Sequence, residues 1–390
     1  MHKKKNNFVF LCASVSLWLI VVAGCATSTI FQSLGDNISS PNGMVIDVAT
    51  NRLYLVNSNS NVLYDWAQGS MQIYDITDPL NLELLYTIPT DSFGGEAVLD
   101  GVRKLLYVSD RFSQQANITE DHLLLINIDE GSPDFENVGS AIVGKDPYGL
   151  YCCYPADRMW ISTGNDDLEY IDLATQTVGS LSLLTSNLSN GGSITQAATS
   201  YIAVNGNQAF LPRNNGGLFV INLDDAGDPT KNAIDYFIED LTLPGGVATD
   251  GTYLYVVDQE QEDDYEPLLL VFNLSALPPI SDNTTTQVLD KDNAGLMAAQ
   301  IIVEDQPATV FLTSQYAFVT CGNYDDPGFV SVIDLATLTL STNIAMGQEP
   351  FGMALYAPGG VEKYLYVGDV IDNTLTMIDI PSLTIAGVYP

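Results

Sequence analysis

Histidine and basic residues are scarce in this chain of 390 residues, which has 2 His and 13 Lys and Arg against 48 Asp and Glu. Three of the basic residues, Lys3, Lys4 and Lys5, lie at the N-terminus, so 10 basic and 48 acidic residues remain in the rest of the chain. A negative field of this size repels phosphate backbones, and we expect no binding to nucleic acid. A solubility adaptation would explain the same charge without any ligand.

The shortage of histidine excludes several kinds of site. Beyond His2, the chain has only His122, so histidine-rich metal sites and cofactors held by several histidines are excluded. A Ser-His-Asp or Cys-His arrangement would need His122 itself, which opens an apolar run and is typical of a strand edge. No P-loop, GxSxG, HExxH or CxxCH motif occurs either. The sequence therefore offers no known catalytic signature.

Long apolar runs are also missing, apart from residues 8–22. This run is short for a membrane span, follows the three lysines, and ends at small residues just before Cys25. The segment resembles a bacterial lipoprotein signal. The resemblance implies removal of residues 1–24 and attachment of lipid to Cys25, and Ala26 favours the outer membrane. An ordinary secretory signal that happens to contain a cysteine is the alternative.

What the chain does contain is a repeat. A strand-like run with a leading aromatic residue recurs seven times, at Tyr54, Tyr107, Trp160, Phe210, Tyr255, Phe318 and Tyr366. Each run is followed by a second that carries Asp or Asn at one position, namely Asp75, Asn127, Asp172, Asn222, Asn273, Asp334 and Asp379. With a Pro/Gly-rich run before and a further run after, each unit has four short strands and a period near 50 residues.

This period and strand count predict an all-β fold, a seven-bladed β-propeller of four-stranded antiparallel blades. The propeller is expected to span residues 37–390, and residues 25–36 to form a lipidated tether or a strand that closes the ring. Residues 281–305 are expected to be an insertion, within which residues 286–290 supply the last strand of blade 5. We expect the seven Asp and Asn side chains to hold the turns that follow them.

The repeat resembles the YVTN-type β-propeller family. Residues 54–57 read YLVN, and residues 330–334 read VSVID, close to the partner pattern of that family. The resemblance covers residues 37–390 and implies the fold rather than a function, because the family is a scaffold class with diverse members. Arg213 and Cys321 depart from the pattern, since each replaces the usual Asn or Asp.

In a propeller the inner strands begin, and the second strands end, on one face, which we call the top face. Three carboxylates are expected at the channel rim on this face: Glu96, Asp146 and Glu349. The ends of the second strands add Asp110, Asp258 and Asp369, which either bind a partner or bond to their own turns. Loops on the same face carry aromatic residues that we expect to bind a partner: Tyr64, Trp66, Phe112, Tyr265 and Tyr324.

Two functions from different classes fit these residues. The first is a binding or scaffolding module of the cell envelope, expected to be monomeric, that captures a protein or glycan through the long top-face loops. The second is an envelope enzyme of hydrolase or lyase type, with Glu96, Asp146 and Glu349 as its acid/base set.

Acidic pairs and cysteines complete the candidate sites. Calcium is the one cofactor that the sequence suggests, with carboxylate ligands from Asp263, Asp264, Asp325 and Asp326. None of these pairs has the spacing of an EF-hand. Cys152 and Cys153 are adjacent on an expected inner strand, where they are either buried free thiols or a vicinal disulfide. Cys321 is expected three blades away.

Overall fold

The computed structural model describes residues 35–60, 68–90, 94–111, 121–153, 157–226, 233–260, 266–280 and 284–390. Residues 1–24, Cys25 and most of the predicted tether lie outside this part of the chain. Besides strands, the described residues contain three short 3-10 helices: η1 (Leu223–Asp225), η2 (Leu274–Ala276) and η3 (Pro358–Gly360). No helix among them is long and apolar enough to cross a membrane.

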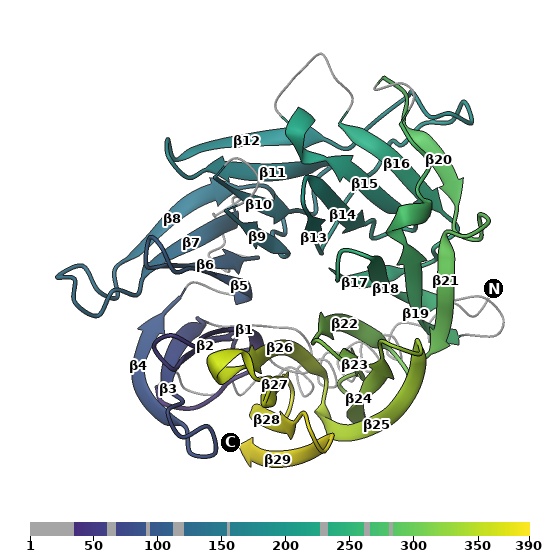
Figure 1. Cartoon of the computed structure of the whole chain (residues 1–390). Helices are drawn as coiled ribbons and strands as arrows, with labels where there is room; N and C mark the ends of the chain where they lie inside the picture. The colour runs from purple at the N-terminus through teal and green to yellow at the C-terminus, as the bar shows by residue number, and fades with distance from the viewer. Residues whose placement is uncertain are drawn as a thin grey trace, which may run out of the picture.

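The described strands form seven sheets that stand side by side around a common axis (Figure 1). This arrangement confirms the predicted seven-bladed β-propeller. Blade 1 comprises β1 (Pro41–Asp47), β2 (Arg52–Asn57), β3 (Ser70–Asp75) and β4 (Glu83–Pro89). Blade 2 comprises β5 (Gly94–Asp100), β6 (Leu105–Asp110), β7 (Asp121–Asn127) and β8 (Val138–Val143). Blade 3 comprises β9 (Leu150–Cys152), β10 (Arg158–Ser162), β11 (Asp167–Asp172) and β12 (Thr177–Ser182).

The remaining blades continue around the ring. Blade 4 comprises β13 (Ala203–Asn205), β14 (Gln208–Pro212), β15 (Leu218–Asn222), β16 (Ile234–Glu239) and β20 (Gln287–Asp290). Blade 5 comprises β17 (Pro244–Thr249), β18 (Tyr253–Glu260), β19 (Glu266–Asn273) and β21 (Met297–Ile302). Blade 6 comprises β22 (Pro307–Leu312), β23 (Tyr316–Cys321), β24 (Pro327–Asp334) and β25 (Thr339–Gln348). Blade 7 comprises β26 (Pro350–Tyr356), β27 (Tyr364–Asp369), β28 (Thr374–Asp379) and β29 (Thr384–Tyr389).

One expected strand belongs to a different blade. The run at 286–290 contains β20, which pairs in parallel with β16 and forms a fifth strand of blade 4. The outer strand of blade 5 is instead β21, which pairs antiparallel with β19. Leu289 of β20 is buried in the apolar cluster between blades 4 and 5. Both segments have strand-like sequences, so their pattern could not assign them to blades.

The apolar core lies between the blades. The described residues contain seven apolar clusters, one at each interface between neighbouring blades. The recurring aromatic residues occupy this core, and Tyr107, Trp160 and Tyr255 are completely buried. Second strands such as β27 are buried along their whole length, whereas outer strands such as β29 are largely exposed. Because both faces of a second strand meet another blade, most of its residues are apolar.

Blades 1 and 7 close the ring by packing and hydrogen bonds. Their shared cluster includes Leu55 and Tyr366. The Ser40 N–H donates to Asn373 Oδ1 at 2.7 Å, and the Tyr366 hydroxyl donates to the Pro79 carbonyl at 3.1 Å. The expected closing strand within residues 25–36 lies almost wholly outside the described residues.

The Asp and Asn residues at the ends of the third strands hold the following turns, as predicted. Asp75 Oδ1 accepts from the Thr77 N–H at 2.7 Å, and Asp334 Oδ1 accepts from the Ala336 N–H at 2.9 Å. The equivalent bonds are made by Asn127, Asp172, Asn222, Asn273 and Asp379. These residues therefore have a structural role in every blade.

Candidate binding site on the top face and in the channel

The strand register shows which strand ends lie together on the top face. Pro41, the first residue of β1, pairs with Asn57, the last residue of β2. Gly94 pairs with Asp110, and Pro350 pairs with Asp369, in the same way. The starts of the inner strands and the ends of the second strands therefore share the top face.

The inner strands approach one another closely near the top of the channel. A Cβ atom on Gly43 of β1 would lie 2.1 Å from the Gly95 carbonyl oxygen of β5. A Cβ atom on Gly352 of β26 would lie 2.1 Å from the Asn42 carbonyl oxygen. These glycines let the backbones of neighbouring blades touch, which draws the side chains of several inner strands toward one point.

That point is a cavity of about 110 Å³ on the channel axis. Residues from or next to all seven inner strands line it, among them Gly43, Glu96, Tyr148, Tyr201 and Phe351. Because every blade contributes to its wall, the cavity is a property of the closed ring and not of one blade.

Four aromatic residues line the cavity, and three of their rings, those of Tyr148, Tyr201 and Phe351, pack together. Tyr148 meets Tyr201 edge to face, with ring centroids 5.3 Å apart, and meets Phe351 in the same manner at 6.0 Å. Tyr148 precedes β9 in blade 3, while Phe351 belongs to β26 in blade 7, so this contact reaches across the channel. Such edge-to-face packing fixes the ring planes relative to one another.

Glu96 is the acidic group of the cavity. Its carboxylate accepts a hydrogen bond from the Leu150 N–H at 2.7 Å, between blades 2 and 3. Burial raises the pKa of Glu96 to about 7, although the Leu150 N–H opposes that rise. The residue keeps a partly exposed surface because it lines the cavity. Glu96 therefore changes charge near neutral pH in a position that a ligand can reach.

The other two rim carboxylates do not join Glu96. Neither Asp146 nor Glu349 lines the cavity. Asp146 instead lies 3.7 Å from Arg111 Nε, and its N–H donates to Asp121 Oδ2 at 2.7 Å. The sequence alone could not give these separations. The described residues thus place one of the three predicted acid/base carboxylates, and not the set, at the cavity.

The strand-end carboxylates are buried, and two of them, Asp258 and Asp369, accept hydrogen bonds. Asp258 Oδ1 accepts from the N–H groups of Thr242 and Leu243 at 3.2 and 2.8 Å. Asp369 accepts from the Gly347 N–H at 3.1 Å and from the Thr376 hydroxyl at 2.6 Å. Asp110 is also buried, with 2% of its surface exposed. These positions organise the turns of the top face and offer a partner little surface.

The candidates on loops are only partly described. Tyr324 is exposed on the loop between β23 and β24, where Asp325 and Asp326 are exposed as well. The N–H groups of both aspartates donate to Asn323 Oδ1, at 2.8 and 3.2 Å. The remaining loop and lipidation candidates lie outside the described residues: Cys25, Tyr64, Trp66, Phe112, Asp263, Asp264 and Tyr265.

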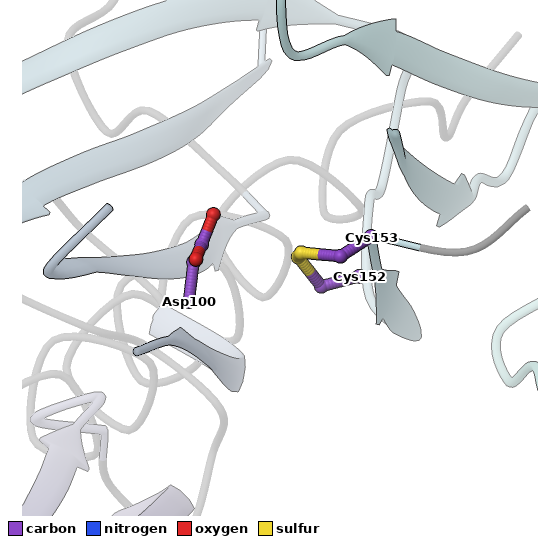
Figure 2. A group of neighbouring side chains, drawn as sticks. All are labelled: Asp100, Cys152 and Cys153. Carbon is purple, nitrogen blue, oxygen red and sulfur yellow. A yellow bond between two sulfur atoms is a disulfide. The ribbon is translucent and has the colours of Figure 1, made fainter. Parts of the chain in front are cut away.

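Cys152 and Cys153 form a vicinal disulfide at the opposite, bottom face (Figure 2). The disulfide and Asp100 lie in a pocket lined by residues 98–102 and 150–153. This is the one group of three potential metal-ligand residues within 4.8 Å among the described residues, and no rim or loop carboxylate joins it. Asp100 is engaged by Arg103, whose Nη1 donates to it at 2.7 Å.

Alkylation of the native protein should distinguish these three cysteines. The disulfide has no free thiol, and burial raises the pKa of the free Cys321 thiol to about 12. We expect iodoacetamide at neutral pH to modify none of the three before reduction, and both Cys152 and Cys153 after treatment with a phosphine reductant. Cys321 should react only once the chain is unfolded. Peptide mass mapping measures each site, and modification of native Cys321 would contradict this placement.

Tyr148, Tyr201 and Phe351 line the cavity but were not among the predicted site residues. A signal was present for two of them, since residues 146–149 read DPYG and residues 349–352 read EPFG. An acidic residue, a proline, an aromatic ring and a glycine thus recur at the start of two inner strands. The pattern gives the aromatic residue, but only the closed ring shows that blades 3 and 7 bring the two rings together.

These features define a β-propeller, a fold that hosts many unrelated functions. The LVIVD repeat, a β-propeller-type repeat, matches residues 361–384. The chain is similar in structure to Kuenenia stuttgartiensis hydrazine synthase, with a TM-score of 0.63 and 12% identity, over 91% of this chain and 99% of that one. It is also similar to the computationally designed Ika8 protein, with a TM-score of 0.54 and 9% identity, over 92% and 89% of the two chains. No curated protein matches the chain. At these identities the structural likeness shows the fold alone.

Proposed function

We propose that this protein is a lipid-anchored β-propeller of the bacterial cell envelope that binds a protein or glycan partner through its top face. One observation carries the proposal: the loops with the candidate aromatic residues connect second strands to third strands and therefore lie on the top face. The connections between second and third strands start and end on the top face, and they include residues 58–69 and 111–120. On the bottom face, the connections between first and second strands are short, such as residues 48–51 and 101–104, whereas those between third and fourth strands are longer, such as residues 128–137.

A rigid ring that carries long loops is a common way to build a binding surface. The sequences of those loops supply Tyr64, Trp66 and Phe112, large side chains of the kind that anchor interfaces. The anchor at Cys25 rests on the lipoprotein-like signal, and the YVTN type of the blades rests on the motifs at 54–57 and 330–334. Two other connections between second and third strands carry Asp263, Asp264, Asp325 and Asp326, which would supply oxygen ligands for Ca²⁺.

Recognition is favoured over catalysis by the placement of the carboxylates. The raised pKa of Glu96 suits an acid/base catalyst. However, Asp146 and Glu349 lie outside the cavity that Glu96 lines. A glycosidase needs two carboxylates facing one substrate across roughly 5–9 Å. The described channel therefore supports a binding site better than a hydrolytic one.

Affinity capture from detergent-solubilised envelope tests the proposal. Replacing residues 61–67 by a Gly-Ser linker should reduce the captured partner at least tenfold, because the loop would carry the main anchors. A matched linker in place of residues 129–136, which join β7 and β8 on the bottom face, should leave capture unchanged. Repeating the capture with a chelator tests the calcium site. Equal loss in both variants, or capture unaffected by either, would contradict the proposal.

A further inference from the structure

We propose that the channel cavity is a binding site for a small organic cation, whose alkylammonium group lies among the rings of Tyr148, Tyr201 and Phe351 with Glu96 as its counter-ion. All four side chains line the same cavity. The rings stand edge to face at 5.3 and 6.0 Å, so they present walls at a steep angle to one another. This inference does not depend on the top-face loops or on the partner they bind.

The dimensions of the cavity limit the ligand. The cavity measures about 110 Å³, and an engineered apolar cavity of about 150 Å³ is known to hold benzene. A trimethylammonium or short alkylammonium group has a similar size, whereas a nucleotide or a flavin does not fit. Aromatic walls attract such a group through their negative ring faces, which is how quaternary ammonium ions are commonly recognised.

The charges around the cavity favour a cation when Glu96 is ionised. Arg111 is the positive group that faces the aromatic cluster among the described residues, with its guanidinium 5.1 Å from the centre of the Tyr148 ring. Asp146 lies 3.7 Å from Arg111 and partly offsets it. The contact with Arg111 shows that the Tyr148 ring accepts a cation on one face. The charge of Arg111 should weaken the binding of a second cation in the cavity.

Affinity should rise with pH. Glu96 has a pKa of about 7, so it binds a cation poorly when protonated below that value and well when ionised above it. Burial raises the pKa values of Tyr148 and Tyr201 well above 10, so both rings stay neutral. A single group of pKa about 7 is ionised about tenfold more at pH 8 than at pH 6, which predicts an affinity about tenfold higher. Binding should in turn lower the pKa of Glu96.

Calorimetric titration of the purified protein with choline and with its neutral isostere 3,3-dimethylbutanol is the test. Choline should bind saturably at concentrations up to about 10 mM, and at least tenfold more tightly than the isostere. This comparison uses the unmodified protein, so no variant has to fold. Equal affinity for the two, or no saturable binding of choline, would overturn the proposal. A peptide with trimethyl-lysine separates the two sources of the same group: tighter binding of the peptide points to a side chain, and tighter binding of choline to a free molecule.

Variants locate the site. Glu96→Gln should weaken choline binding at least tenfold at pH 8 and remove the pH dependence, while Arg111→Gln should strengthen binding. Tyr201→Leu should also weaken binding. The matched control is Tyr86→Leu, which removes a half-buried tyrosine of the outer strand β4 and should leave choline binding unchanged. Choline binding that persists with the same pH dependence in Glu96→Gln would place the ligand elsewhere and overturn the assignment.

Discussion

Alanine at position 43 is expected to destabilise the ring by about 3 kcal/mol or more, as overpacking at a site that cannot relax does. The added Cβ would lie 2.1 Å from the carbonyl oxygen of Gly95 and 3.2 Å from the Cα of Glu96. Both contacts are with backbone, so no side chain can rotate away. Relief requires blades 1 and 2 to separate, which disturbs the apolar cluster between them.

The matched control is Gly101→Ala. Gly101 lies in the exposed turn between β5 and β6, and a Cβ atom there would meet no other atom within 4 Å. This variant should be as stable as the parent or slightly more so, because alanine restricts the unfolded chain. Urea unfolding followed by tryptophan fluorescence measures both midpoints. Equal midpoints for Gly43→Ala and Gly101→Ala would contradict the close approach of the inner strands.

Replacement of Cys25 by serine is expected to release the protein from the membrane completely. If Cys25 carries lipid chains, each buried methylene contributes about 0.8 kcal/mol to membrane binding, and two or more chains hold a protein stably. The effect should therefore be all or none rather than graded.

Carbonate-washed membranes from bacteria that express the full chain provide the measurement. The parent protein and the control Cys321→Ser should stay with the membranes, since Cys321 is buried in the propeller. Mass spectrometry of the N-terminal peptide should show lipid on Cys25 after loss of residues 1–24. Cys25→Ser found with the membranes at the parental level would contradict the anchor. A parent protein cleaved elsewhere and free of lipid would indicate an ordinary secretory signal.

The ring was predictable because its signals recur. A leading aromatic residue such as Tyr107 is completely buried between blades, and a trailing residue such as Asp334 holds a turn, so each position reports a local contact that every blade repeats. The exchange of β20 into blade 4 was not predictable, because it breaks the repeat. Which of two strand-like segments pairs with a given edge depends on packing between blades, where Leu289 is buried.

The site was predictable only in part, because it depends on contacts between blades that the repeat does not encode. Glu96 could be placed at the rim from its position on an inner strand. Its raised pKa and its association with Tyr148 and Phe351 depend on residues from three blades. Periodicity gives the position of each residue within its blade, but the spacing across the channel is set by the glycines at which the inner strands meet.

Hydrogen–deuterium exchange of the protein alone and with its captured partner tests the central claim, which is binding through the top face. The account predicts that the partner slows exchange in residues 58–70 and 111–121, where second strands lead into third strands. It predicts no change in residues 101–104 and 129–136 on the bottom face. Protection confined to the bottom face or to outer strands such as β8 and β29 would contradict it.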